Sequence, residues 1–491
     1  MNYKKHLIIP ITLAIIVGSF SCGTKTDGSD DTSSAKETAE TSVQEDTGVK
    51  SELPKLDFGG KDFTIFVEDY GGVCGPEFCT EEADGDIVND AVYMRNVTVS
   101  EQLNLNIKWE LFTHGWNDRS EFTNKFRSSV FAGDGSYDLA AGTGYFMPAF
   151  VSDRILYDMS SLPYIDISKP WWSKEFMEVS AVDGKYYFVT GDACLGLIKN
   201  MYCVFENLDL AETLGVENLY DVVREGRWTL DKMKETAAAQ YADLNGNTKI
   251  DRDDRFGLLM DGGNHITGFF EALEVDIVEF RNGQPEFIYD NAHNTDVVEK
   301  LTSFVMNTEG IYFDEQANDE TADNSIFRDG NVLMSTGWLN HTESFRDLSF
   351  SYGVLPYPKW DESQTEYKTS VFPCYSVLTV PVDSHDKECA AAVCEALAYE
   401  SWKSVTPAYF ETALKVKYAN DSDSAQMFDI IRDGISFDFG YVYTLPLNAI
   451  NDKFKDCVRQ EDSWASFIAK IKPAAVEKLN ELVDQIRDMN N

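Results

Sequence analysis

One loop of the sequence carries oxygen-bearing side chains at the spacing of a cation site. It follows a predicted helix over residues 230–242, with Thr229 as N-cap, and reads DLNGNTKIDRDD. Loop positions one, three, five, nine and twelve offer carboxylate or amide oxygens, and position seven offers its carbonyl. These residues are Asp243, Asn245, Asn247, Lys249, Asp251 and Asp254. Because hard cations take oxygen ligands at this spacing, we predict a structural Ca²⁺ here.

Two positions depart from the usual pattern of an EF-hand-type loop. Thr248 stands at position six, where glycine normally permits the sharp turn. Asp254 replaces the longer bidentate glutamate at position twelve. The alternative is an acidic solvated turn, which is common in a chain this acidic. If the loop does hold calcium, chelation should lower the melting temperature.

A tryptophan at the end of a predicted strand could bind a sugar. Residues 326–338 predict a helix end, a strand and a turn that exposes Trp338. An aromatic face can pack on the apolar C–H face of a pyranose ring while planar polar groups hold the hydroxyls. The alternative is a core tryptophan. Trp171, in the pair that follows Pro170, is a secondary candidate because such pairs more often pack than bind.

Other candidates stand at inferred strand ends. Residues 63–67 predict a first strand, 85–103 a helix, 105–109 a second strand and 120–131 another amphipathic helix. A short strand then runs into the turn 141–145, and residues 186–190 predict a strong strand. Ligands of open α/β sheets bind at strand carboxyl ends. The side chains at such ends are Asp69, Tyr70, Thr143, Tyr145 and Tyr375.

The sequence shows no catalytic constellation. It lacks the motifs HExxH, GxSxG and CxxC, and its six histidines show no helical pairing. Carboxylate pairs are abundant only because the chain is acidic, so they do not indicate a glycosidase. We therefore predict a protein that is not an enzyme.

Composition excludes one class of partner. The chain has 42 Lys plus Arg against 83 Asp plus Glu, a formal net charge of −41. A phosphate backbone would be repelled, so nucleic acid and other polyanions are not expected as partners. A hydrophobic content of 43% still predicts a well-packed body, with enough residues for two lobes.

The N-terminus predicts export and anchoring. Lys4 and Lys5 precede an apolar run from Leu7 to Phe20, which is too short to span a bilayer comfortably and suits a secretory signal. The run ends at Cys22 and resembles a bacterial lipoprotein signal, which implies lipidation of Cys22. Ordinary secretion or an uncleaved anchor is the alternative. Residues 23–56 are polar and predict a disordered tether.

Eight of the nine cysteines remain after Cys22. Cys74 and Cys79 lie in the loop GGVCGPEFCT, which could close a small disulfide or leave both thiols reduced. Cys389 and Cys394 would lie on different faces of a helix, so a local bond between them is not expected.

Six pieces in this order resemble one protein family. They are GDIVNDAVYMRN, VFAGDGSYDL, SLPYIDISKPWW, DGKYYFVTGD, YDVVREGRWTLDKM and FSYGVLPYPKWDE. They are similar to the extracellular solute-binding proteins of bacterial ABC importers, in particular the long type that serves carbohydrate uptake. The resemblance implies an α/β, two-lobed periplasmic-binding-protein-like fold of the Venus flytrap type, with solute bound in a hinged cleft between the lobes.

The resemblance also suggests where the lobes divide. We expect lobe I over residues 57–187 and 353–403, and lobe II over residues 188–352 and 404–491. The first crossing between lobes would lie near residues 186–190 and the return near residues 352–356. The C-terminal segment would pack back on the second lobe.

The function implied is that of a lipid-anchored substrate-binding protein on the extracellular face of the membrane. It would capture a solute, for which an oligosaccharide is the expected class, and deliver it to the transmembrane subunits of an ABC permease. The alternative is a surface carbohydrate-active enzyme or glycan adhesin that uses the calcium loop as a clip. A binding protein that feeds a sensor kinase is a third possibility, and peptide, polyamine or metal-chelate ligands also suit this architecture.

Overall fold

A computed structural model describes residues 48–314, 325–415 and 422–489. Residues 48–491 form one compact unit, separate from residues 1–47. The predicted export signal, Cys22 and most of the predicted tether therefore lie outside the described residues. The last residues before position 57 contact the body, since Ser51 Oγ donates to Glu395 at 2.7 Å and Leu56 packs against the core. In the described part, no helix has both the length and the apolarity to cross a membrane.

Four strands of the described chain form a first sheet in the order β11-β3-β1-β2. Strands β1 (Lys61–Tyr70), β2 (Leu105–His114) and β3 (Leu139–Thr143) are parallel, and β11 (Ser376–Thr379) is antiparallel. Helices α1 (Ile87–Leu103) and α2 (Arg119–Ala132) follow β1 and β2. Asp86 caps α1 by accepting from Val88 and Asn89 N–H, as expected for a short acceptor at an N-terminus. The predicted strand-helix-strand order is confirmed.

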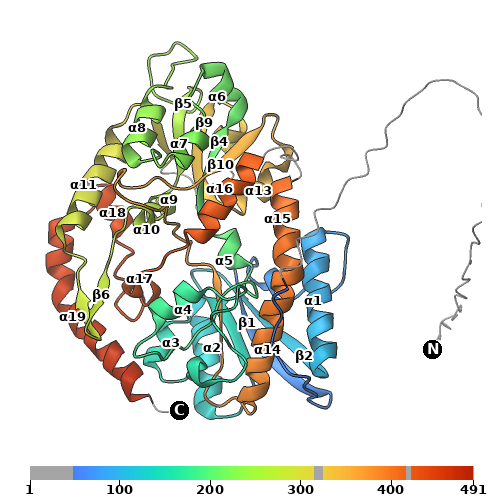
Figure 1. The fold of residues 1–491 in the computed structure, drawn as a ribbon. Coiled ribbons are helices and arrows are strands. Elements are labelled where there is room, and N and C mark those ends of the chain that lie inside the picture. Colours follow the sequence, from blue (N-terminus) through green and yellow to red (C-terminus); the bar gives the residue numbers. More distant parts are fainter. Residues whose placement is uncertain (1–47, 315–324, 416–421, 490–491) are drawn as a thin grey trace, which may run out of the picture. The chain divides into compact units, whose positions relative to one another are not determined.

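Within the described residues, five strands form a second sheet in the order β10-β4-β9-β5-β8. They are β4 (Tyr202–Asn207), β5 (Phe256–Asp261), β8 (Ile311–Asp314), β9 (Val332–Trp338) and β10 (Tyr352–Leu355). Strands β5, β8 and β9 are parallel, whereas β4 and β10 run antiparallel to their neighbours β9 and β4. Helix α8 (Leu230–Ala238) has Thr229 as its cap, as predicted, although it ends four residues before the predicted Ala242. Figure 1 shows the two sheets at opposite ends of this two-lobed α/β fold.

The remaining elements cover the sheets and connect them. They are η1 (Gly75–Glu77), α3 (Ala149–Ser152), η2 (Met159–Ser161), α4 (Lys174–Ser180), α5 (Gly196–Lys199), α6 (Leu208–Leu214), α7 (Leu219–Arg224), α9 (Asn264–Thr267), α10 (Phe269–Ala272), β6 (Val278–Arg281), β7 (Gln284–Phe287), α11 (Ala292–Asn307), α12 (Ser325–Arg328), α13 (His341–Ser344), η3 (Phe345–Asp347), α14 (Lys387–Glu400), η4 (Ser401–Val405), α15 (Thr406–Lys415), α16 (Ser422–Asp433), α17 (Phe439–Val442), α18 (Phe454–Val458) and α19 (Trp464–Asp488).

One predicted strand is wrong. Residues 186–190 form no ladder strand. They meet β11 of the first sheet through an isolated bridge between Val189 and Leu378 and through hydrogen bonds from the Thr190 and Thr379 hydroxyls. Their side chains are buried, so the apolar run that suggested a strand reflects packing instead. The later crossing begins after β10, which still belongs to the second sheet, and reaches the first sheet at β11.

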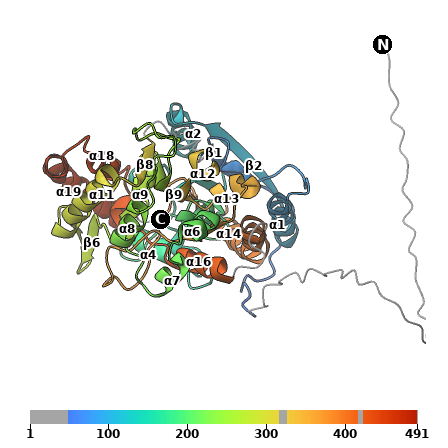
Figure 2. The ribbon, with the colours of Figure 1, turned by 90° about the horizontal axis from the view of Figure 1, so that it is seen from above.

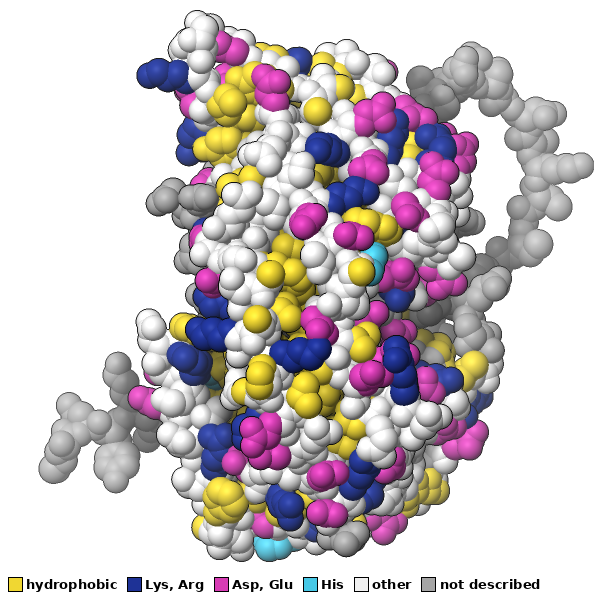
Figure 3. All heavy atoms as spheres, turned by 90° about the vertical axis from the view of Figure 1, so that its left-hand side faces the viewer, with side chains coloured by type: hydrophobic (Ala, Val, Ile, Leu, Met, Phe, Trp, Pro, Cys, Tyr) yellow, Lys and Arg dark blue, Asp and Glu magenta, His cyan; other side chains and the backbone are white. Residues whose placement is uncertain are grey.

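Helical segments also run between the lobes. Helices α14 and α15 are continuous through η4, and α14 packs on α1 whereas α15 also reaches α13 beside the second sheet (Figure 1). The long helix α19 contacts both β7 and α3. Figures 1 and 2 both show α19 next to α11, where Trp464 donates to Thr295 at 3.3 Å. On the face that carries α11 and α19, acidic, basic and hydrophobic side chains are interspersed (Figure 3).

Candidate functional site

One cavity lies among loops and helices of both sheets. The loop after β1 and the start of α1 contribute to its wall from the side of the first sheet, and α5 and the turn after β9 contribute from the side of the second. The cavity has a volume of about 400 Å³. Its wall includes Cys74, Glu77, Asn89 and Cys374 from the first-sheet side and Lys199, Asn200, Asn340, Glu343 and Arg346 from the second. This is where open α/β sheets bind ligands.

The polar groups of the cavity suit an uncharged solute. Three amide side chains, those of Asn89, Asn200 and Asn340, line it. Asn340 Oδ1 is buried and has no hydrogen-bond partner among the described residues, although Asn340 N donates to Lys199 O at 2.9 Å. A buried acceptor of this kind is costly unless a donor fills the space. Asn340 therefore offers an acceptor to a ligand hydroxyl.

The charged groups of the cavity are largely neutralised by one another or by burial. Lys199 Nζ lies 2.9 Å from Glu343 Oε1. Glu77 accepts from Gly196 N–H at 2.6 Å and from the Ser376 hydroxyl. Burial raises the pKa of Glu77 above its usual value. The cavity thus has no strong excess of one charge, which favours a neutral polar ligand over an ion.

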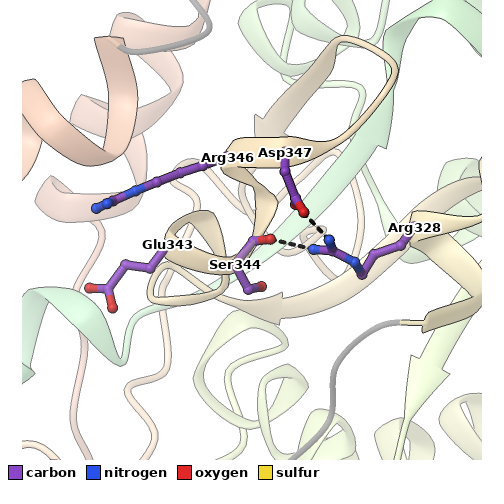
Figure 4. Close-up of a pocket in the computed structure, with 5 residues that line it drawn as sticks. All are labelled: Arg328, Glu343, Ser344, Arg346 and Asp347. Carbon is purple, nitrogen blue, oxygen red and sulfur yellow. Dashed lines mark hydrogen bonds and ion pairs between the residues drawn. The ribbon is translucent and has the colours of Figure 1, made fainter.

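A second cavity adjoins the first along α13. It has a volume of about 420 Å³ and is lined by Arg328, Glu343, Ser344, Arg346 and Asp347. Figure 4 shows Arg328 turned toward Ser344 and Asp347, whereas Arg346 and Glu343 extend to the other side. Arg328 donates to Asp347 at 2.5 Å and to the Ser344 carbonyl. Because Glu343 and Arg346 line both cavities, a ligand longer than the first cavity could extend toward the second.

Three predicted ligand-binding residues of the first sheet hold loops in place instead of facing open space. Asp69 is buried and accepts from Gly75 N–H at 2.8 Å and Thr113 Oγ1 at 2.7 Å. Thr143 is buried and donates to Glu68 from both its backbone and its hydroxyl. Tyr375 is buried against Phe176 and Phe437. Their direct contact with a ligand stays a prediction.

Tyr70 and Tyr145 are only half-buried at their strand ends. The Tyr145 hydroxyl donates to Asp452 Oδ2 at 3.0 Å, which joins the loop after β3 to the segment between α17 and α18. Burial, opposed by this hydrogen bond, raises the pKa of Asp452. The Tyr145–Asp452 hydrogen bond therefore forms only when the loop after β3 and the segment between α17 and α18 are in contact.

The predicted exposure of Trp338 is wrong in this structure. The side chain is 5% exposed and stacks on Phe372, with ring centroids 4.8 Å apart. Its ring also packs against those of His265 and His341, with ring centroids 5.1 and 4.9 Å away. The turn after β9 folds back over the ring, because α13 begins three residues later. Whether Trp338 contacts a solute stays a prediction.

Trp171 lies in the core of the first lobe. Its side chain is fully buried, its indole N–H donates to Glu395 Oε2 at 3.0 Å, and its ring packs on Tyr399 and Trp402. Trp171 therefore anchors the segment before α4 to α14.

Trp116 is exposed just after a strand end but is not among the residues predicted from the sequence. Trp116 follows β2 and is 46% exposed. The Arg119 guanidinium lies 4.2 Å from its ring centroid, and Tyr145 lies 5.8 Å away. The strand-end rule that selected Tyr70 and Tyr145 would also have selected Trp116.

The predicted calcium loop is closed by hydrogen bonds among its own side chains. Asp243 accepts from Gly246 and Thr248 N–H at 2.6 and 2.8 Å. Asn247 Nδ2 donates to Asp251 at 2.7 Å. Thr248 has φ +62°, so this residue adopts the left-handed conformation that glycine normally provides at position six.

The carboxylates of this loop do not form a ready-made cluster. Asp254 is fully buried, and its oxygens accept from Tyr241 at 3.1 Å and from Leu244 N–H at 3.3 Å. Throughout the described residues, no group of three or more His, Cys, Asp or Glu side chains could hold a metal ion as placed. The donor types and the backbone turn suit Ca²⁺, but the carboxylates would have to turn inward to bind it.

The small disulfide between Cys74 and Cys79 is not formed in the structure. The helical turn η1 separates the two residues, and Cys79 N–H donates to Gly75 O at 3.0 Å. The Cys74 thiol instead points to Cys374, with Sγ and the Cys374 carbonyl oxygen 3.9 Å apart.

Comparison with protein-family models gives one match that covers more than half of the chain. Residues 104–395 match the model described as bacterial extracellular solute-binding protein. Comparison with curated protein sequences found no significant match.

Solved structures share the fold at low sequence identity. The galacto-N-biose/lacto-N-biose I-binding protein from Bifidobacterium longum, in complex with lacto-N-biose, is 14% identical with a TM-score of 0.58 over 86% of this chain and 98% of that one. An ABC substrate-binding protein from Listeria monocytogenes, in complex with cycloalternan, is 15% identical with a TM-score of 0.53 over 87% and 98%. A receptor of Streptomyces glaucescens, solved unliganded and with acarbose, is 12% identical with a TM-score of 0.51 over 88% and 100%.

Proposed function

The chain belongs to the bacterial extracellular solute-binding proteins, and on that premise we propose that it captures an uncharged oligosaccharide between its two lobes. The bound solute is then delivered, chemically unchanged, to an ABC permease. The observation that carries the proposal is the cavity of about 400 Å³ lined from the sides of both sheets, with amide side chains in its wall and the unpartnered Asn340 Oδ1.

The chemistry of the site supports a sugar as solute. Hydroxyl groups can donate to amide oxygens such as Asn340 Oδ1, and the exposed Trp116 ring could pack on the C–H face of a sugar. The relatives solved with lacto-N-biose, cycloalternan and acarbose support the same class. The adjoining second cavity favours a ligand of several units over a monosaccharide.

Binding works by a shift between open and closed lobes. A solute that touches residues of both lobes at once, such as Asn89 and Asn340, binds only the closed arrangement well. Its affinity for that arrangement drives closure. The site itself then needs no catalytic group, and the solute leaves intact.

The test is calorimetric titration of an oligosaccharide panel into the full exported protein. For the sugar that binds, Asn340→Ala and Trp116→Ala should each raise Kd by about tenfold or more, because Asn340 offers an unpartnered acceptor in the cavity wall and Trp116 offers an exposed ring after β2. Asn480→Ala, which alters an exposed amide on α19, is the matched control and should leave Kd unchanged. Turnover of a bound glycan, or unaltered Kd in both the Asn340 and the Trp116 variant, would contradict the proposal.

We also propose that the body is held at the extracellular membrane face by a lipid on Cys22. The support is the apolar run before Cys22 and the polar segment after it. Labelling with a fatty-acid analogue in cells, compared with Cys22→Ser, tests this anchor.

We further propose that the loop from Asp243 to Asp254 binds a structural Ca²⁺. The support is the oxygen-bearing donor set at the expected spacing and the left-handed Thr248. In this role, Asp243, Asn245, Asn247, Asp251 and Asp254 would provide side-chain oxygens and Lys249 its carbonyl. The ion would hold the segment between α8 and β5.

A further inference from the structure

Two cysteines on separate segments meet in the wall of the interlobe cavity. Cys74 precedes the η1 turn after β1, and Cys374 lies between β10 and β11. The Cys74 thiol donates to the Cys374 carbonyl oxygen, with Sγ and O 3.9 Å apart. Both residues line the cavity of about 400 Å³. The two residues are therefore in contact, and small molecules in the cavity can reach them.

Backbone hydrogen bonds fix both positions. Gly75 N–H donates to Asp69 Oδ1 at 2.8 Å, which holds the turn that carries Cys74. On the other segment, Tyr145 N–H donates to Pro373 O at 3.1 Å, one residue before Cys374. Since the residues next to both cysteines are held, bond formation depends on rotation of the two cysteine side chains.

Cys79 is the other thiol close to Cys74 in sequence. Burial raises the pKa of Cys74 well above its usual value, and the nearby Cys374 raises it further. Burial also raises the pKa of Cys79. The η1 turn separates Cys79 from Cys74, and Cys79 N–H donates to Gly75 O at 3.0 Å, whereas the Cys74 thiol contacts Cys374 directly. The geometry at Cys74 therefore favours Cys374 over Cys79.

We propose that Cys74 and Cys374 form a disulfide bond when the exported protein meets a disulfide oxidant, which ties the loop after β1 to the crossing segment between the lobes. One cysteine thiolate attacks the disulfide oxidant, which forms a mixed disulfide and releases one thiol. The second cysteine then attacks the protein sulfur of the mixed disulfide and releases the other thiol. The two cysteines lose two protons and two electrons, and the oxidant is reduced to two thiols. The proposal rests on the proposed function only for the extracellular location, where such bonds persist.

The raised pKa of Cys74 predicts how fast the bond forms. The thiolate is the attacking species, so little of it is available near neutral pH. The rate of formation should therefore increase with pH until the thiol is ionised. A bond that forms slowly but persists suits a structural role more than a catalytic one.

The test uses the full exported chain with glutathione disulfide as oxidant. After oxidation, remaining thiols are blocked with N-ethylmaleimide, and the protein is digested without reductant for mass spectrometry. We expect a peptide that joins Cys74 to Cys374, with loss of alkylation at both, in the wild type and in Cys79→Ser. The joined peptide should be absent from Cys374→Ser. A peptide joining Cys74 to Cys79, a stable glutathione adduct on Cys74, or full alkylation of both would overturn the proposal.

A second measurement keeps this test separate from the test of sugar binding. The melting temperature of the oxidised wild type and of oxidised Cys79→Ser should exceed that of the reduced forms, whereas Cys374→Ser should show no such increase. Neither readout involves a solute. A protein that forms the bond yet binds no sugar would contradict only the proposed function, and one that binds sugar without forming the bond would contradict only this inference.

Discussion

The protonation of single buried acids in this protein depends on burial as well as on neighbouring groups. Glu206, in β4, is 2% exposed, and burial alone raises its pKa to about 8. By contrast, Glu68 is fully buried but accepts from Thr143 and lies 2.9 Å from His114 Nε2. A buried acid without such partners destabilises the folded state once it ionises.

Glu206 makes stability depend on pH. The folded protein keeps this proton to about pH 8, whereas the unfolded chain releases it near the ordinary value of 4.5. The contribution of Glu206 is thus intact below pH 4.5 and is lost as pH rises through 8. Within this window, the free energy of unfolding should fall by up to about 1.4 kcal/mol per pH unit.

Glu206→Gln removes this dependence, because the amide does not titrate. We expect the variant to gain stability relative to the wild type as pH rises between 5 and 8, measured by urea unfolding at each pH. Glu121→Gln, which changes an exposed side chain on α2, is the control and should show a constant difference. A Glu206→Gln difference that does not vary with pH would mean that the carboxyl is ionised in the folded state.

At the scale of elements, loops are held by the side chains that end the strands. Asp69 closes the loop after β1, and Thr143 is fixed by Glu68 at the end of β3. Cys74, in the loop that Asp69 holds, lines the cavity, whereas Asp69 and Thr143 are not part of its wall. Preorganised loops of this kind reduce the entropy lost when a ligand binds.

Calcium binding to the loop between α8 and β5 should change the melting temperature of the protein. Addition of Ca²⁺ should raise the melting temperature and chelation should lower it, because an ion bound only by the folded loop stabilises the protein in proportion to its saturation. Asp243→Asn combined with Asp251→Asn should abolish the shift by removing two charged ligands. Differential scanning fluorimetry measures both.

The matched control for the calcium loop is the double substitution of Asp84 and Asp296 by Asn, which alters two exposed acids outside the loop. It should keep the calcium shift. Equal melting of the wild type with calcium and with chelator would contradict the calcium proposal and leave the acidic turn as the correct interpretation.

The whole molecule brings two sheets into one functional unit. Residues on the side of each sheet line one cavity, and continuous helices such as α14 and α15 connect the lobes on one side. The contact from Tyr145 to Asp452 joins segments that are far apart in the sequence. An arrangement with several connections and one shared cavity can open and close as a hinge.

Closure predicts a change of size. The radius of gyration of residues 48–491 should decrease when the cognate sugar binds, because the solute stabilises the closed lobes. Tyr145→Phe should raise Kd by about two- to tenfold, the effect of one lost hydrogen bond of about 0.5–1.5 kcal/mol. Small-angle X-ray scattering and calorimetry measure the two effects.

Tyr164→Phe is the matched control for closure. The Tyr164 hydroxyl also donates to a carboxylate, since it lies 2.6 Å from Glu388 Oε1, but Glu388 belongs to α14, which packs on α1 beside the first sheet. It should leave the affinity unchanged. A radius of gyration that is the same with and without a bound sugar would contradict hinge closure.

The sequence by itself determined the types and order of the elements, because helix caps and periodicity act over a few residues. The cap at Asp86, the cap at Thr229 and the strand over 63–67 are examples. The same local rules did not select the residues of the cavity wall, because none of the predicted ligand-binding residues is among the described residues that line it. They failed for residues 186–190, because a short segment that is buried on all sides has the same apolar run as a buried strand.

Only the tertiary structure decided which side chains at strand ends are exposed and which residues line the cavity. Trp338 stacks on Phe372 and is buried, whereas Trp116 is exposed, and nothing local to either residue distinguishes them. Cys74 meets Cys374 instead of Cys79. Each outcome depends on atoms contributed by distant segments, and packing between such segments is set by the fold as a whole and not by neighbours in sequence.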